Sequence, residues 1–241
     1  MNIYIKLTDW LNTNQGVLTL IIFFATLFFG WVSGIFSALR RKPKFILSLI
    51  DGPTFSCTYP IGKIKNNYEL HRTGIALYLS VVNTGSSPSS IENVSVAYHW
   101  NILPFSMLWI KYSLGWFWLH KQAAALEDFQ CKIGKSIKVY PFLFQNTILG
   151  SHKTETYLNV GQSTNGVVYF EQSDSWGACS PKATKGNIKI KVMVKDAFGR
   201  RYIKTFYIPS VSIEHARKYN PSFGKTLAEL NNEKILHDQE I

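Results

Sequence analysis

Histidines and cysteines are the side chains best suited to bind metals or to act as nucleophiles, but their spacing here predicts neither role. The six histidines occur singly, without an HxH or HExxH pair, and the three cysteines lie far apart, without a CxxC pair. They are His71, His99, His120, His152, His215, His237, Cys57, Cys131 and Cys179. Because protein metal sites depend on short, regular ligand spacing, we expect no metal and no cofactor. The odd number of scattered cysteines fits a reducing compartment.

Two carboxylates, Glu171 and Asp174, lie three residues apart near the end of a predicted strand. Paired acids can perform general acid–base catalysis, but a pair needs a pocket and a partner, and the sequence shows neither. We interpret this segment as a solvated loop anchored by Trp176. The chain also lacks a GxSxG nucleophile motif and a GxxxxGK[ST] phosphate loop. We therefore expect a protein that is not an enzyme.

Basic residues give the clearest pattern. Eight of them lie between Lys182 and Lys204, together with a single acid, Asp196. Alternate residues of a strand point to the same side, so several of these cations share one face of a predicted strand. The candidate anion-binding residues are Lys189, Lys191, Lys195, Arg200, Arg201 and Lys204. Three interpretations stay open: a solvated sheet face, a surface for anionic lipid headgroups, or a site for nucleic acid or a nucleotide.

The elements that carry these residues are predicted to be strands, because apolar side chains alternate with polar ones at period two. The alternation is clear over 75–82 and 91–100 and clearest over 187–208, where residues 196–199 close a predicted hairpin. No convincing helix lies between the strands. We expect a mainly β domain over residues 45–211, built as an antiparallel β-sandwich.

The segment LYLSVVNTGSSPSSIENVSVAY, residues 77–98, resembles in general pattern an early hairpin of an immunoglobulin-like domain. The resemblance covers about 22 residues and implies a sandwich fold. The Cys…Trp…Cys signature of true immunoglobulin domains is not convincingly placed.

Residues 17–39 form an apolar run of 23 residues without a charge. That length crosses the ~30 Å hydrocarbon core of a bilayer, and it exceeds the usual apolar region of a cleaved signal peptide. We predict a single transmembrane helix here, after a short extracytoplasmic segment, residues 1–16. The basic linker that follows, residues 40–44, contains Arg40, Arg41, Lys42 and Lys44. The positive-inside rule then places the β domain in the cytoplasm, at the inner (plasma) membrane.

Small residues recur within the predicted helix at helical spacing. They are Gly30, Ser33, Gly34, Ser37 and Ala38. On one helix face, such residues let a second backbone approach closely, so we expect helix–helix packing and a homo-oligomer.

Residues 102–121 form an apolar, tryptophan-rich insertion between predicted strands. A second membrane span is disfavoured, because Lys111 would cost about 2.5–3.5 kcal/mol near its centre and the strands would lie on opposite sides. The remaining interpretations are a core segment and, the one we favour, an insertion that dips into the inner leaflet. The predicted interface residues are Trp109, Lys111, Tyr112, Trp116 and Trp118.

The last segment, residues 212–241, is predicted to hold a short helix over 212–219, with Ser212 as its N-cap and an end before Pro221. A second short helix is predicted over 226–235.

Composition adds a final constraint: 17% charged residues, 15% aromatic residues and a net charge of +11 favour an anionic partner. We expect a membrane-anchored binding or assembly protein that contacts anionic lipid and binds a cytoplasmic ligand or protein. A tethered nucleic-acid or nucleotide-binding module is the first alternative. An enzyme whose site the sequence does not reveal is the second.

Overall fold

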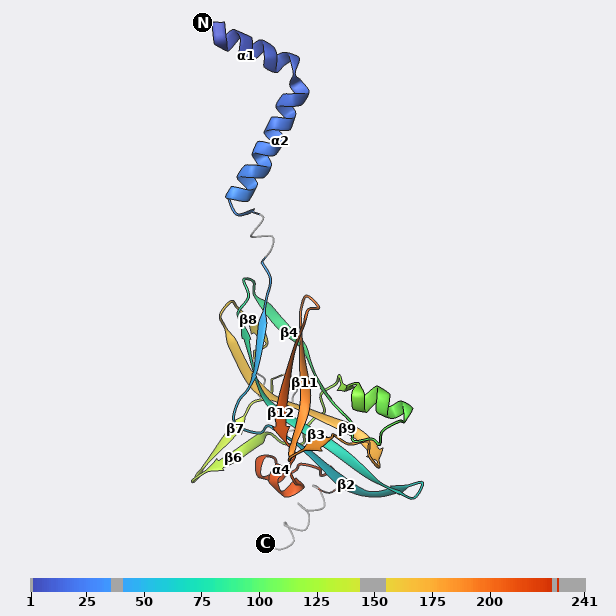
Figure 1. Ribbon diagram of the computed structural model, residues 1–241. Coiled ribbons are helices and arrows are strands. Elements are labelled where there is room, and N and C mark those ends of the chain that lie inside the picture. Colours follow the sequence, from blue (N-terminus) through green and yellow to red (C-terminus); the bar gives the residue numbers. More distant parts are fainter. Residues whose placement is uncertain (1, 36–40, 144–154, 227–228, 230–241) are drawn as a thin grey trace. The chain divides into compact units, whose positions relative to one another are not determined.

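The computed structural model describes residues 2–35, 41–143, 155–226 and 229, and its contacts divide the chain into two units, Met1–Lys42 and Pro43–Ile241. Strands take up 46% of the residues that the structure describes, and the paired strands of its sheets are antiparallel (Figure 1). The prediction of a mainly β protein is confirmed.

The first unit consists of two helices, α1 (Asn2–Thr13) and α2 (Gln15–Val32), with non-helical backbone at Asn14 between them. Helix α2 has 18 residues, no charge and no buried residue. At 1.5 Å per residue it measures about 27 Å, close to the thickness of a bilayer core. It is the one helix of the described residues that is long and apolar enough to cross a membrane. The crossing itself stays a prediction.

Helix α2 is shorter at its carboxyl end than the predicted span. It ends at Val32, and Gly34 has a φ of 76°, which lies in the left-handed region that terminates helices. Gly30 lies within the helix, whereas Ser33 and Gly34 form the turn after it. The described part of the small-residue stripe is therefore not one continuous helix face. Its other members, Ser37 and Ala38, lie outside the described residues, as does Arg40.

The second unit contains a four-stranded sheet built around the long strand β3 (Tyr68–Asn83). Strands β1 (Phe45–Leu49) and β2 (Phe55–Lys65) pair with successive parts of one edge of β3. Strand β9 (Ser163–Trp176) pairs with the other edge over almost its whole length.

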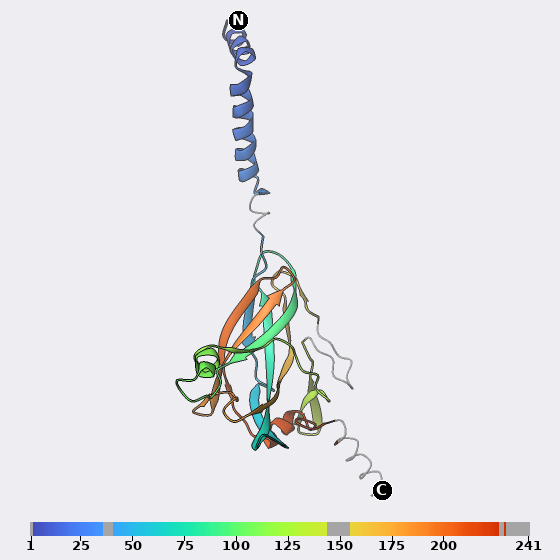
Figure 2. The same ribbon diagram turned by 90° about the vertical axis from the view of Figure 1, so that its right-hand side faces the viewer.

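A second sheet has six strands, and β11 (Asn187–Asp196) is paired along both of its edges (Figure 2). The other members are β4 (Ser89–Tyr98), β5 (Phe117–Leu119), β8 (Tyr157–Leu158), β10 (Ala183–Thr184) and β12 (Arg201–Pro209). A separate two-stranded sheet joins β6 (Phe129–Ile133) to β7 (Ser136–Tyr140).

Both large sheets contribute side chains to one apolar core. In β11, Ile188, Ile190, Val192 and Val194 are buried, as the alternation predicted, and they join residues of β1, β3, β4 and β9. A core shared by two antiparallel sheets is what a β-sandwich requires. The immunoglobulin-like topology stays a prediction.

A second core covers the other face of the four-stranded sheet. It combines Phe55, Tyr78 and Tyr169 of that sheet with Phe129 from β6 and Ala216 from helix α4 (Ile213–Tyr219). The Ser212 side chain accepts a hydrogen bond from the backbone N–H of His215, which confirms the predicted N-cap. The second predicted helix, residues 226–235, lies almost wholly outside the described residues.

Candidate functional site

The tryptophan-rich insertion leaves the sheet after β4 and projects from it as a loop and a short π-helix, η1 (Trp109–Leu114). Its root is fixed by aromatic packing. The backbone N–H of Trp100 donates to the Tyr112 carbonyl at 2.8 Å, and the two rings lie 4.4 Å apart. Tyr112, predicted to face lipid, therefore packs against the protein.

The outer part of the insertion exposes apolar side chains to an unusual degree. Phe105 is 94% exposed, Met107 86% and Leu103 80%. Leu108, Ile110 and Leu114 are at least half exposed. The core interpretation is therefore wrong for these exposed side chains, and no described helix of this segment is long enough for a second span.

The inner part of the insertion belongs to the sheet. Residues 117–119 form β5, which pairs with β4 so that Trp118 lies opposite Ala97. The Trp116 ring packs on His99 with their centroids 3.9 Å apart, and Trp118 stacks on His120. The sequence pattern did not predict this strand, because three residues are too few to show a period.

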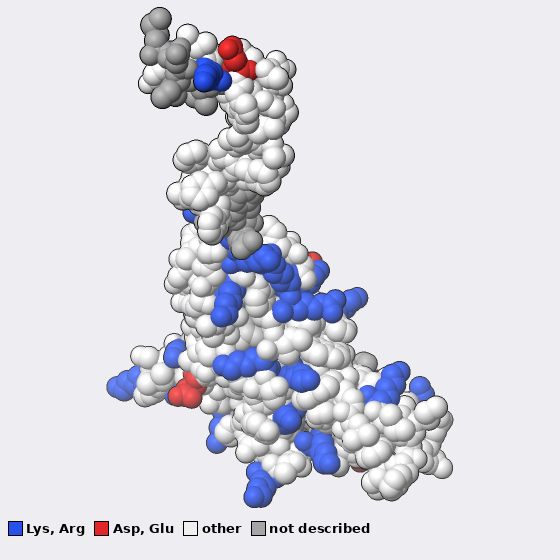
Figure 3. All heavy atoms as spheres, turned by 45° about the horizontal axis from the view of Figure 1, so that its top comes forward, with Lys and Arg blue, Asp and Glu red and all other residues white. Residues whose placement is uncertain are grey.

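Strand register divides the predicted basic patch between two faces. Residues directly opposite each other in an antiparallel pair share a face, so Lys189, Lys191, Lys195 and Arg201 lie together on the outer face of the six-stranded sheet. Lysine and arginine side chains spread over the face of the β domain seen in Figure 3, where acidic side chains are few. Lys195 forms an ion pair with Glu92 at 2.9 Å.

Lys204 is the exception to the patch. It lies opposite the buried Val192, on the core side of the edge strand β12, and its ammonium donates to the Leu47 carbonyl at 2.8 Å. Lys204 therefore joins the two sheets through this hydrogen bond, although the residue stays exposed. Arg200 lies in the β11–β12 turn and is half-buried.

The fold brings Trp116 beside the lysines of β11, although more than 70 residues separate them in the chain. The Lys191 ammonium lies 4.3 Å from the Trp116 ring centroid and that of Lys189 lies 6.0 Å away, which is cation–π distance. Partial burial lowers the pKa of His99, and the two lysine charges add to that effect. The neutral ring donates from Nδ1 to the Gly115 carbonyl at 2.7 Å. The basic patch thus has the aromatic component that the strand pattern lacked.

The carboxylates of Glu171 and Asp174 share one cation. The Arg72 guanidinium lies 3.1 Å from Glu171 and 2.9 Å from Asp174, and the Tyr59 hydroxyl donates to Glu171 at 3.0 Å. The hydrogen bond from Arg72 lowers the pKa of Asp174. Both acids therefore belong to an ion-pair network within β9 and not to a solvated loop. Arg72 comes 99 residues before Glu171, so local sequence gave no signal of the pairing.

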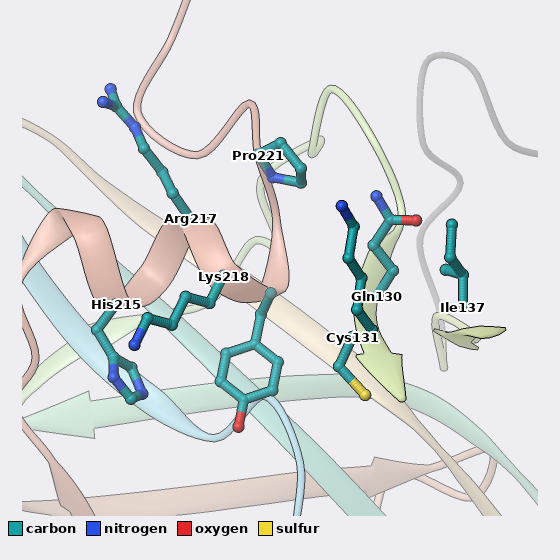
Figure 4. A pocket seen from close by; sticks show the side chains of 9 residues that line it. Gln130, Cys131, Ile137, His215, Arg217, Lys218 and Pro221 are labelled. Carbon is teal, nitrogen blue, oxygen red and sulfur yellow. The ribbon is translucent and has the colours of Figure 1, made fainter. Parts of the chain in front are cut away.

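A cavity of about 520 Å³ lies between α4 and the β6–β7 hairpin (Figure 4). Its described lining carries basic side chains and no carboxylate. The lining residues are Gln130, Cys131, Lys132, Ile137, His215, Arg217, Lys218, Tyr219 and Pro221. The Cys131 thiol lies 3.3 Å from the Tyr140 hydroxyl beside this cavity. The sequence did not reveal this site, because its two walls lie some 80 residues apart.

Comparisons with known proteins give no name to these surfaces: neither a protein-family model nor a curated protein sequence matches the chain. Among the residues that the structure describes, no group of three or more histidine, cysteine or acidic side chains is placed to hold a metal ion.

Proposed function

We propose that this protein is a non-enzymatic, membrane-anchored binding and assembly protein. Helix α2 crosses the inner (plasma) membrane once, and the β domain, an immunoglobulin-like sandwich, lies in the cytoplasm. The length and apolar composition of α2 support the anchor, and the basic residues Arg41, Lys42 and Lys44 support the orientation. Three free cysteines agree with a reducing compartment.

The observation that carries this proposal is the exposed apolar surface of residues 103–114. Side chains such as Phe105 and Met107 form an exposed cluster, and such clusters mark contact with lipid or with a partner. Trp109 and Lys111 belong to the same segment, and the basic outer sheet face lies beside it. Tryptophan and lysine together suit the interface of an anionic bilayer. We therefore assign the inner leaflet as the partner of this surface.

Hydrogen–deuterium exchange of the full chain tests the lipid contact. In nanodiscs that contain phosphatidylserine, amides of residues 103–114 should exchange more slowly than in nanodiscs of phosphatidylcholine alone. The turn between β2 and β3, with positive φ at Asn66 and Asn67, serves as the internal control, because no contact is proposed there. Replacing Phe105 and Met107 with serine should remove the protection. Equal exchange in both lipids would contradict the assignment.

The cavity between α4 and the β6–β7 hairpin is the proposed site for a cytoplasmic ligand. Its volume falls in the range of small-molecule sites, and its cations call for an anionic ligand. Nucleoside triphosphates and inorganic pyrophosphate are suitable probes in calorimetry of the full chain. Binding that weakens about tenfold or more in a Lys132→Gln, Lys218→Gln variant supports the site, with Lys65→Gln as the control. Equal binding by the wild type, the double variant and the control would contradict the assignment of this cavity as the ligand site.

A second candidate function is a membrane-tethered module for single-stranded nucleic acid. The observation that favours it is Trp116 beside Lys189 and Lys191, because such proteins combine stacking aromatics with backbone-tracking cations. Its signature is binding to single-stranded nucleic acid that falls steeply with salt and is lost in a Trp116→Ala variant. Binding to anionic vesicles without binding to nucleic acid would favour the lipid assignment.

A further inference from the structure

The turn between β11 and β12 presents a phenylalanine to solvent. Phe198 lies in the turn Asp196–Arg200 and is 65% exposed. The backbone N–H of Asp196 donates to the Arg200 carbonyl at 3.0 Å, and that of Gly199 donates to the Asp196 carbonyl at 2.9 Å. Gly199 has a φ of 80°, which glycine adopts without strain. The hairpin therefore closes tightly and leaves the phenyl ring outside it.

A buried carboxylate, that of Asp196, fixes the conformation of the turn that exposes Phe198. Asp196 is fully buried, and its Oδ1 accepts hydrogen bonds from the backbone N–H groups of Phe198 and Arg200, both at 2.9 Å. The Tyr202 hydroxyl lies 2.9 Å from Oδ2 of the same carboxylate. Because buried carboxylates must be fully hydrogen-bonded, this network holds the turn in one shape.

Basic residues lie near the turn in the chain and in the fold. Arg200 and Arg201 follow Phe198 in the chain, and Lys44 precedes Phe45, whose ring packs on Tyr202 with ring centroids 5.0 Å apart. Lys44 and Arg201 are exposed, and neither forms an ion pair with a described residue. Lys44, Arg200 and Arg201 are here called the cationic collar. An exposed apolar side chain together with such cations combines the hydrophobic and electrostatic interactions that bind proteins to anionic bilayers.

The turn lies beside the start of the β domain. The Tyr202 hydroxyl also lies 2.8 Å from the carbonyl of Pro43, the first residue of the β domain. Pro43 follows Val32 by eleven residues, a stretch that spans at most about 40 Å. The exposed insertion, by contrast, follows the far end of β4, about 30 Å along that strand from the turn.

We infer that the β11–β12 turn is a second membrane contact, in which Phe198 enters the interface of an anionic bilayer and Arg200, Arg201 and Lys44 bind headgroup phosphates. The inference rests on the proposed crossing by α2, and it adds a rigid docking point that the insertion does not provide. Lipid phosphates are the partner because the collar is cationic and the chain continues from here toward α2.

Depth measurements on the full chain test this contact. An environment-sensitive fluorophore is attached to Phe198→Cys, in a background with Cys131→Ser and Cys179→Ser, and quenched by nitroxides on lipid acyl chains. Ile64→Cys is the matched control, because Ile64 is an apolar residue, 77% exposed, near the end of β2, where it pairs with Glu69 at the start of β3. In vesicles with phosphatidylserine, the label at 198 should be quenched and blue-shifted, and the label at 64 should not.

A second variant tests the contribution of the cationic collar to this contact. Each basic residue near an anionic surface contributes about 1 kcal/mol, so Arg200→Gln with Arg201→Gln should lower the docked-to-free ratio of the turn about 30-fold. An anchored chain whose label at 198 stays unquenched, or is quenched no more than the label at 64, would overturn this inference and leave the anchor intact. Release of the chain by alkaline carbonate would overturn the anchor, and the turn contact with it.

Discussion

Arg72 determines the role of two other residues, Glu171 and Asp174. Two carboxylates three residues apart suggest acid–base chemistry in a sequence, yet in the fold both bind this guanidinium. Because the hydrogen bond from Arg72 lowers the pKa of Asp174, this carboxylate is a poor proton donor at neutral pH. The pair therefore fixes β9 to β3, and its contribution is to stability.

Replacement of Arg72 with methionine should lower the free energy of unfolding by about 1–2 kcal/mol, because two partly exposed carboxylates lose a charged hydrogen-bond donor. Urea unfolding in detergent measures the change, with Lys65→Met as an exposed control that should differ by less than about 0.5 kcal/mol.

The effect of Arg72→Met should depend on pH. The pKa of Asp174 is lowered in the folded state, so its contribution is complete above its unfolded pKa of about 3.9 and is lost as the pH falls through the lower folded value. Wild type and variant should therefore converge in stability at strongly acidic pH. A constant difference from neutral to acidic pH would show that the loss is one of packing.

At the scale of strands and helices, the sequence was informative wherever one side of an element is buried. In β11, Ile190 and Val192 alternate with Lys189 and Lys191, and burial follows that alternation. The sequence also predicted residues 75–82 of β3, most of β4 and helix α4. Three-residue β5 and the π-helix η1 were not predictable, because their conformations depend on packing against β4 and Trp100.

The candidate surfaces were predictable only in part. The lysines of β11 were found because they share one strand, but Trp116 joins them through strand pairing that no local pattern records. The sequence did not show that Lys204 lies on the other face from these lysines, because that depends on the hairpin register, which places it opposite Val192. Long-range pairing is the information that a single sequence lacks.

Truncation of Ile190 to alanine should cost about 2–5 kcal/mol of unfolding free energy, because the side chain is fully buried between the two sheets. Ile203→Ala, on the neighbouring strand, is the matched control: its side chain is 55% exposed, and the change should stay within about 0.5 kcal/mol. Similar losses at both positions would contradict the assignment of the inner and outer faces.

Helix α2 offers one clean test of self-association. Gly30→Leu places a large side chain within the helix and should reduce crosslinked oligomers in membranes, if that face packs against a second copy. Gly34→Leu is a poorer probe, because a φ of 76° strains any larger residue regardless of packing. Val32→Leu is the control. Unchanged oligomers in the Gly30→Leu variant would show that this face of α2 does not form the contact between copies.

At the scale of the whole molecule, the orientation across the membrane can be tested with the cysteines already present. Burial raises the pKa of the Cys57 thiol to about 11, and the nearby charge of Glu214 adds to that effect, so it should resist alkylation at pH 8. Cys131 is half-buried and open to reagent. A membrane-impermeant maleimide should label Cys131 in inside-out vesicles and not in right-side-out vesicles.

Denaturation supplies the control for this labelling, because Cys57 should then react as well. Labelling of Cys131 from outside intact cells would reverse the topology and place the β domain on the opposite side.

Strand β3 has a consequence for how the chain is made. Its partner β9 ends at Trp176, 93 residues after β3 ends at Asn83. At about 5–20 residues per second, a ribosome needs about 5–20 s to supply those residues. During that interval, one edge of a 16-residue strand has no partner, and its central residues, 75–79, are apolar on both faces. Newly made chains should therefore depend on chaperones or on prompt capture at the membrane, and slower translation between β3 and β9 should lower the yield of soluble β domain.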